Sequence, residues 1–290
     1  MTDLPTDPDP TITPADLRAI AVEVAAAAGG LIVADRPERL HVATKSTDTD
    51  VVTEMDQRAQ DYLVAALRER RPDDGFVGEE EGESHLGASG ITWVVDPIDG
   101  TVNYLYGVPA YSVSVAAVTG DPRIEGGYEP LAGAVVNPVT GDVYSAARGE
   151  GATRTDRTGT VVRLRVNDVD DLGQALVATG FGYAADRRAW QAAVLAGLLP
   201  EIRDIRRMGS AALDLCRVAE GSVDAYYERG LNAWDLAAGW LIVTEAGGTV
   251  SGRGSAVPGV DLVIASGNAL RPLFVEGLER AMSATDVTSA

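Results

Sequence analysis

An apolar run that leads directly into acidic residues is the feature that most constrains the fold of this chain. Residues 91–95 (ITWVV) are typical of a core strand, because their β-branched and aromatic side chains fit a pleated sheet. Asp96 follows at once, and Pro97 and Gly100 predict that the strand ends here. The sequence therefore predicts two carboxylates, those of Asp96 and Asp99, on a rigid support at a strand end.

These residue types suit a site for a cation and an anion together. Carboxylates three positions apart can converge on a hard divalent cation, and the carbonyl of Ile98 can add a further oxygen. Gly100 and Thr101 open a short helix, whose unpaired N–H groups would suit a phosphate. The alternative is an ordinary turn with carboxylates that face solvent.

Two distant segments favour the metal interpretation. Residues 76–81 (FVGEEE) place an acidic cluster after a short apolar stretch. Asp235 precedes the apolar residues 236–243, where we expect it to be the N-cap of a helix that ends at the glycines 247 and 248. An N-cap carboxylate can also present an oxygen to a metal.

With these pieces, the chain resembles the inositol monophosphatase family of magnesium-dependent, lithium-sensitive phosphatases, and most closely its bacterial branch. The two signature segments are residues 93–104 and residues 234–239, the latter running on to 245–248. The resemblance extends from about residue 14 to the C-terminal helix. Supporting matches are Lys45-Ser46, Asp50, Asp56, Gly78-Glu79-Glu80 and the segments 209–212 and 224–228.

The resemblance implies two or three Mg²⁺ ions per site. Glu79, Asp96 and the Ile98 carbonyl would hold the first, and Asp96, Asp99 and Asp235 the second. Such paired ions activate a water for direct attack on phosphorus, so no phosphoenzyme would form.

Further roles are implied in the same way. Thr101, polarised by Asp56, would orient the attacking water beside Glu79. The Gly100 and Thr101 amides would bind phosphate oxygens. Substrate hydroxyls would contact Asp99, the backbone of Ala211 and Glu228, and a mobile loop would carry Lys45 and Asp50. Glu80, Glu81 and Glu83 are interpreted as a solvated acidic turn outside the site.

Charge and composition support a metal-dependent enzyme. Lys and Arg number 24 against 43 Asp and Glu, for a net charge of -19, which argues against general nucleic-acid binding. An acidic pocket binds phosphate only if cations reverse its field, so metal dependence follows from the charge. The single cysteine, Cys216, lies in a helical pattern as a core thiol and favours a reducing, cytoplasmic location. No signal peptide and no membrane-spanning segment are expected.

The element pattern predicts a mixed α+β and α/β fold. Residues 1–13 form a disordered tail, and a helix begins at Thr13, Pro14 and Asp16. Residues 14–290 form a single phosphatase unit, with an antiparallel-sheet half (about 14–165) packed on a mixed α/β half (about 166–285). The resemblance implies a layered α-β-α-β-α sandwich and a homodimer. The expected strands are 112–118, 131–136, 142–147, 175–178, 223–228 and 262–265, and the expected later helices are 187–199, 210–219 and 235–246.

Other phosphatase chemistries lack their residues. Asp-x-Asp motifs at residues 48–52 and 7–11 follow no buried strand, and Cys216 has Ser222 where a cysteine phosphatase needs arginine. His41 and His85 lie in polar loops. The expected substrate is a small phosphate monoester, with inositol monophosphate first and histidinol phosphate second. Fructose 1,6-bisphosphate and 3'-phosphoadenosine 5'-phosphate remain open within the family, and a transcription-associated binding role remains open outside it.

Overall fold

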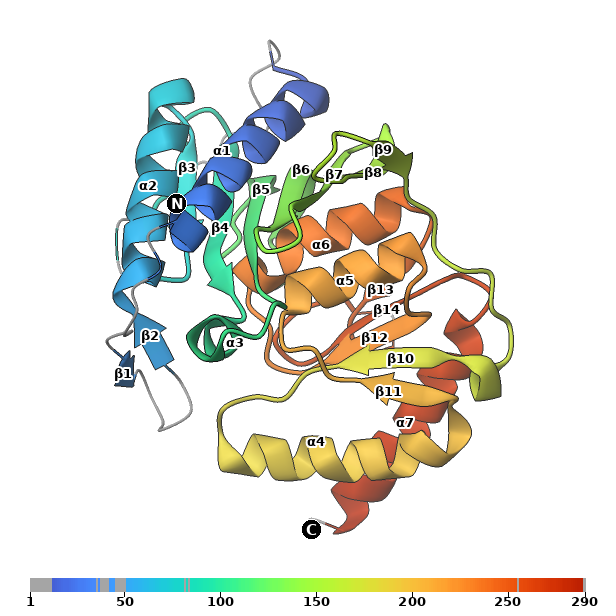
Figure 1. Ribbon diagram of the computed structural model, residues 1–290. Coiled ribbons are helices and arrows are strands. Elements are labelled where there is room, and N and C mark those ends of the chain that lie inside the picture. Colours follow the sequence, from blue (N-terminus) through green and yellow to red (C-terminus); the bar gives the residue numbers. More distant parts are fainter. Residues whose placement is uncertain are drawn as a thin grey trace, which may run out of the picture.

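The chain folds into five layers in the order α-β-α-β-α, as expected from the sequence (Figure 1). The computed structural model describes residues 12–34, 36, 42–44, 51–80, 82, 84–254 and 256–288. Residues 1–11 and the loop residues Lys45 and Asp50 lie outside the described residues, so the predictions on them stay predictions.

The first sheet has seven strands in sequence order, β3-β4-β5-β6-β7-β8-β9. Only the β3–β4 pair is parallel, and every other neighbouring pair is antiparallel. A separate hairpin pairs β1 (Val42–Thr44) with β2 (Val51–Thr53). The strands of the large sheet are β3 (Gly75–Gly78), β4 (Ile91–Asp99), β5 (Ser112–Gly120), β6 (Tyr128–Asn137), β7 (Asp142–Ala147), β8 (Gly151–Thr155) and β9 (Val161–Arg163).

The second sheet is mixed and has the order β11-β10-β12-β14-β13. Strand β10 pairs parallel with β11 and with β12, and β14 pairs antiparallel with β12 and with β13. Its members are β10 (Leu176–Thr179), β11 (Asp204–Arg206), β12 (Ala225–Glu228), β13 (Thr249–Ser251) and β14 (Val263–Ser266). The strand predicted from residue 223 begins at Ala225, because Asp224 instead accepts a hydrogen bond from the Leu176 amide.

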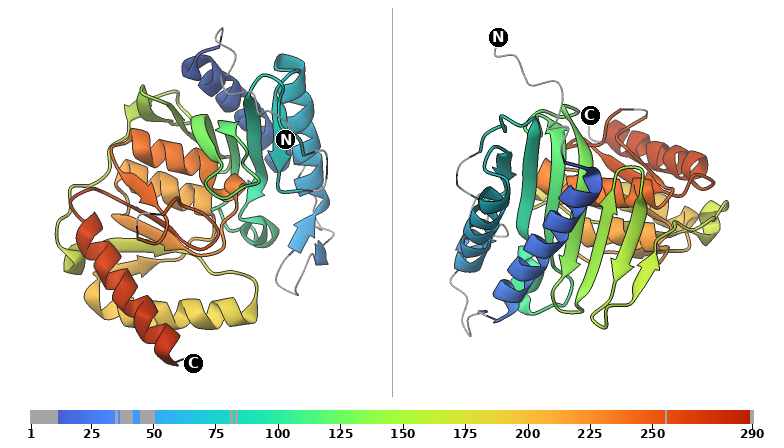
Figure 2. Two further views of the ribbon diagram at one scale, coloured as in Figure 1. Left: turned by 180° about the vertical axis from the view of Figure 1, so that it is seen from behind. Right: turned by 90° about the horizontal axis from the view of Figure 1, so that it is seen from above.

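Helices fill the three remaining layers, with α5 and α6 between the two sheets (Figure 1). Helices α1 and α2 cover the free face of the large sheet, and α4 and α7 cover that of the small sheet (Figure 2). The helices are α1 (Pro14–Ala34), α2 (Glu54–Arg70), α3 (Thr101–Tyr106), α4 (Ala185–Leu198), α5 (Ala211–Glu220), α6 (Ala233–Glu245) and α7 (Arg271–Thr288), with short 3-10 turns η1 (Leu172–Gln174) and η2 (Leu199–Glu201).

Alternation along β4 explains how one strand serves two cores. The side chains of Trp93 and Val95 pack under α1 and α2, whereas Val94 packs against α5 and α6. The buried Trp93 indole donates to Asp74 at 2.9 Å, so its polar atom is satisfied. Cys216 is fully buried on α5, as predicted, and burial raises the pKa of its thiol.

Helix α1 confirms one prediction and corrects another. The Asp16 amide donates to the Thr13 hydroxyl and the Thr13 amide to the Asp16 carboxylate, which is the predicted cap. The expectation that no segment is long and apolar enough to span a membrane is wrong, because α1 passes that test with a mean hydropathy of 1.8. Core helices pass the same test. Here Leu17, Val24 and Ile32 are buried against the large sheet and α2.

Candidate active site

The two aspartates of β4 face the same layer because the strand is irregular between them. In a regular strand, residues three apart point to opposite faces. Asp96 lies opposite Ser114 and Asp99 opposite Ser112, so β4 contains one extra residue here. This bulge turns Ile98 to the α1 and α2 side and brings Asp99 round to join Asp96. The strand thus continues past Pro97 and ends at Asp99, directly before Gly100, one of the two residues expected to end it.

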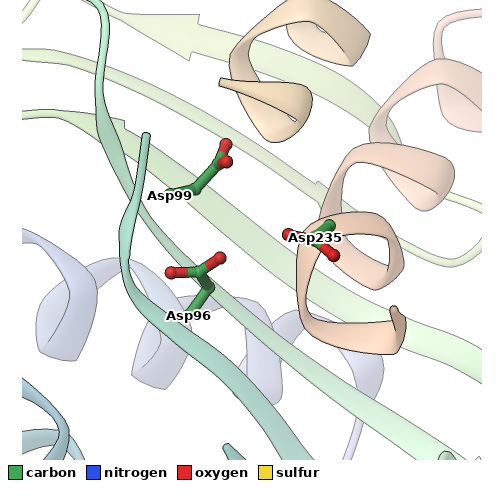
Figure 3. A group of neighbouring side chains, drawn as sticks. All are labelled: Asp96, Asp99 and Asp235. Carbon is green, nitrogen blue, oxygen red and sulfur yellow. The ribbon is translucent and has the colours of Figure 1, made fainter. Parts of the chain in front are cut away.

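The third carboxylate comes from the first turn of α6. The N-cap of this helix is Asn232, and Asp235 is its third residue, which corrects the expectation that Asp235 is the cap. One Asp235 oxygen accepts the Asn232 amide at 2.7 Å, in a capping box. Ligand atoms of Asp96, Asp99 and Asp235 lie within 4.8 Å of one another, and Figure 3 shows them around a common space.

Asp96 is the residue of the site with the most unusual environment. Its side chain is 1% exposed, and neither carboxylate oxygen has a hydrogen-bond partner among the described residues. Burial, followed by the charges of Glu79, Asp99 and Asp235, raises the pKa of Asp96 well above its usual value. A buried carboxylate without partners is costly unless a cation neutralises it.

Asp99 is held by the N-terminus of α5. Its carboxylate accepts from the Ser210 hydroxyl at 2.5 Å and from the amides of Ala212 at 2.8 Å and Ala211 at 3.3 Å. Figure 3 shows the carboxylate pointing toward this helix end. Burial raises the pKa of Asp99, and these hydrogen bonds oppose the rise. Burial and the charge of Glu79 likewise raise the pKa of Asp235.

Most of the residues predicted for the site meet at one cavity of about 270 Å³. Glu79 reaches it from the end of β3, where Gly78 pairs with Val95 one residue before Asp96. Asp56 lies outside the lining, buried in the first turn of α2, and its charge contributes to the raised pKa of Asp96. The predicted residues in the lining are Glu79, Asp96, Ile98, Asp99, Gly100, Thr101, Ala211, Glu228 and Asp235.

The turn after β4 opens a short helix, as predicted. Gly100 has φ +95°, and a Cβ there would lie 3.0 Å from the Gly209 carbonyl oxygen, so backbone and packing both require glycine. The Thr101 hydroxyl donates to the Ile98 carbonyl at 3.1 Å. The hydroxyl oxygen of Thr101 can therefore still accept a hydrogen bond. The predicted pairing of Thr101 with Asp56 stays a prediction.

Glu228 also lines the cavity. It lies at the end of β12, accepts the Tyr226 hydroxyl at 2.5 Å, and packs so close to Gly180 that a Cβ there would lie 2.0 Å from it. Burial raises the pKa of Glu228 to about 7.

The acidic turn was only partly understood from the sequence. Glu80 is 9% exposed rather than solvated, because the Gln60 side chain accepts its amide and donates to its carbonyl, both at 2.8 Å. Glu81 and Glu83 lie outside the described residues.

The cavity also contains residues that the sequence reasoning missed. Arg187, Arg207 and Arg229 line it, together with Phe181 and Tyr183. They belong to three chain segments with no recognisable motif spacing. The nearest signals were the predicted substrate contact Glu228, directly before Arg229, and the predicted turn at Gly209, two residues after Arg207.

The residues present fit Mg²⁺. A hard cation takes oxygen ligands at short range, and the cluster offers carboxylate oxygens from Asp96, Asp99 and Asp235 with a fourth carboxylate nearby on Glu79. The partnerless oxygens of Asp96 are the group that such an ion would satisfy.

The fold and this acidic cavity define a phosphatase, and the chain belongs to the inositol monophosphatase family. The sequence model of that family matches residues 13–283. The family acts on small phosphate monoesters.

Individual relatives cover nearly the whole chain. An inositol-1-monophosphatase of Mycobacterium leprae is 45% identical over 93% of this chain and 96% of its own. A Pasteurella multocida protein named Nus factor SuhB is 42% identical over 80% and 83%. The solved structure of Mycobacterium tuberculosis SuhB superimposes with a TM-score of 0.78 at 41% identity, over 93% of this chain and 98% of that one.

Proposed function

We propose that this chain is a Mg²⁺-dependent phosphatase that hydrolyses myo-inositol monophosphate to inositol and phosphate. The observation that carries the proposal is the carboxylate of Asp96, buried and without a partner beside two further carboxylates. Glu79, Asp96 and the Ile98 carbonyl would hold one ion, and Asp96, Asp99 and Asp235 a second. When bound, these ions supply the positive field for the phosphate and lower the pKa of a water.

The chain's own residues would bind and orient the reactants. The Gly100 and Thr101 amides would donate to phosphate oxygens, and Thr101 and Glu79 would orient the attacking water. Its oxygen bonds to phosphorus as the ester P–O bond breaks, and the leaving alkoxide takes a proton. Asp99, Ala211 and Glu228 would contact polyol hydroxyls, although the Ala211 amide here donates to Asp99.

The test is a set of steady-state rates in Mg²⁺ with inositol 1-phosphate, histidinol phosphate, fructose 1,6-bisphosphate and 3'-phosphoadenosine 5'-phosphate. We expect inositol 1-phosphate to give the largest kcat/KM, and Asp235→Asn to lose most turnover with every substrate. An inositol phosphate rate at background would refute the substrate, and a rate unaffected by EDTA would refute the metal.

The name of the Pasteurella relative favours a second candidate, a role in transcription complexes. Asp235→Asn separates the two, because it should disable turnover and leave the fold in place. A cellular role that survives in this variant belongs to binding rather than catalysis. The proposal includes a homodimer, lithium inhibition and a cytoplasmic location, which sedimentation, lithium titration and cell fractionation would test.

A further inference from the structure

Tyr226 is a fully buried tyrosine whose hydroxyl bonds a residue of the active-site cavity. It lies two residues before Glu228 on β12, so the two side chains lie on the same face of the second sheet. Its ring packs with residues of α5 and α6 between the two sheets. The hydroxyl donates to Glu228 at 2.5 Å, a length typical of a hydrogen bond to a charged oxygen. The proposed hydrolysis gives this hydroxyl no role.

The Glu228 carboxylate is held from two sides. Tyr226 donates to Oε2, and the backbone of Gly180 lies so close that an added Cβ would be 2.0 Å from Oε2 and 2.3 Å from Oε1. Gly180 is itself fixed, because its carbonyl accepts from the buried Gln191 side chain at 3.3 Å. Among the described residues, no donor bonds to Oε1. This oxygen can therefore accept a hydrogen bond from a ligand in the cavity that Glu228 lines.

Nearby charges act on Glu228 in opposite directions. Burial raises its pKa and the Tyr226 hydrogen bond lowers it, while the charges of Asp214 and Asp99 raise it and that of Arg207 lowers it. Asp214 and Asp99 therefore repel an ionised Glu228. A glutamate side chain has several rotamers, so a specific contact is needed to select one of them. Tyr226 supplies that contact from a ring that core packing holds in place.

We propose that Tyr226 is a positioning residue for substrate selection, which fixes Oε2 of Glu228 so that Oε1 accepts a hydroxyl of the polyol substrate. The inference rests on the proposed function, in which Glu228 contacts those hydroxyls. It assigns part of the preference for polyol esters to a buried residue that touches no substrate. Esters whose alcohol carries no further hydroxyl gain nothing from this contact.

The test is Tyr226→Phe, which removes only the hydroxyl. Rates in saturating Mg²⁺ are compared for myo-inositol 1-phosphate and for p-nitrophenyl phosphate, whose leaving group carries no hydroxyl. For the inositol ester we expect KM to rise about tenfold and kcat to change less than about twofold, as for one contact made equally in the ground and transition states. For p-nitrophenyl phosphate both constants should stay within about twofold of wild type, which also shows that the variant folds.

Two further variants and a control separate positioning from stability. Tyr227→Phe is the matched control, because Tyr227 packs against Phe274 on the opposite face of β12, and it should change neither substrate. Gly180→Ala places a Cβ where Oε2 now lies, and it should give the same selective loss as Tyr226→Phe. In a Glu228→Ala background, Tyr226→Phe should change kcat/KM for the inositol ester by less than about twofold, because no carboxylate is left to position.

The positioning role would be overturned if Tyr226→Phe left KM for the inositol ester unchanged, or lowered kcat/KM equally for both substrates. A further loss of about tenfold in the Glu228→Ala background would also overturn it, because the effect would then not pass through Glu228. If the wild type does not hydrolyse the inositol ester, the proposed function fails, and calorimetric Kd values for that ester in Mg²⁺ decide the role of Tyr226 separately. A Kd about tenfold higher in Tyr226→Phe than in wild type would support the role. Equal Kd values, or no binding by the wild type, would exclude it.

Discussion

Ser210 is the residue through which the N-terminus of α5 holds Asp99 in place. Its hydroxyl donates to the Asp99 carboxylate at 2.5 Å and accepts the Leu213 amide at 3.3 Å as the helix cap. Ser210→Ala removes both bonds and the 3.2 Å contact with the Ser112 hydroxyl. The bond to a charged group is worth about 1.5–3 kcal/mol, and the long cap bond lies near the lower end of about 0.5–2 kcal/mol.

We therefore expect the unfolding free energy of Ser210→Ala to fall by about 2–3 kcal/mol in EDTA. Asp99 should also lose its fixed orientation, and groups that orient a metal ligand typically change metal affinity by about 10- to 100-fold. The Mg²⁺ concentration for half-maximal activity should rise by that factor. Calorimetry of Mg²⁺ binding without substrate should show the same change.

Two controls separate positioning from stability. Ser210→Thr keeps the hydroxyl and should retain Mg²⁺ affinity. Asp171→Ala removes the cap of η1, which accepts the Gly173 amide on the exposed surface, and should lower stability without changing Mg²⁺ affinity. The reasoning would be refuted if Ser210→Ala melted earlier but bound Mg²⁺ within twofold of wild type.

Three further predictions follow from burial and backbone geometry. Asp96→Asn should raise Tm in EDTA at pH 7.5, because it removes a buried charge among like charges. The same variant should lower Mg²⁺-dependent turnover at least about 100-fold. An unchanged Tm would contradict this account. Burial raises the pKa of Asp214 from 3.8 to about 7, so the folded protein retains at pH 5 a proton that the unfolded chain has released. The unfolding free energy of the wild type, measured in urea, should fall between pH 5 and pH 7 and level off above pH 7. Asp214→Asn should reduce the slope of this fall by up to about 1.4 kcal/mol per pH unit. Identical slopes for the two proteins would disprove the role of Asp214. Gly100→Ala should cost about 1–3 kcal/mol in denaturant and most of the activity, whereas Gly149→Ala, at φ +81° with open space around it, should cost less and leave turnover intact.

Local patterns in the sequence carried much of the fold. The apolar run 91–95, the cap at Thr13 and the strand Asp142–Ala147 appear where they were expected, because alternation and capping depend on neighbours within a few residues. The end residues of helices and strands were predicted less accurately than their existence. Helix α6 begins two residues before Asp235, because the capping box assigns Asp235 to the third position.

Residue chemistry and the family resemblance together identified the acidic side chains as a set, since carboxylate oxygens are typical ligands of a divalent cation. They did not indicate how each one is held. Asp99 faces Asp96 only because of the bulge, and it is bound by Ser210, 111 residues away in the chain. Contacts at such separations leave no periodic signal in a single sequence.

The sequence by itself determined the layered class of fold, the family and the types of residue at the site. Only the tertiary structure decided that the oxygens of Asp96 have no partner among the described residues, and that Arg187 and Arg207 line the same cavity as Asp96. The physical reason is that hydrogen-bond satisfaction and charge compensation depend on which groups surround an atom. Those groups come from β3, β4, α4, α5 and α6, which only folding brings together.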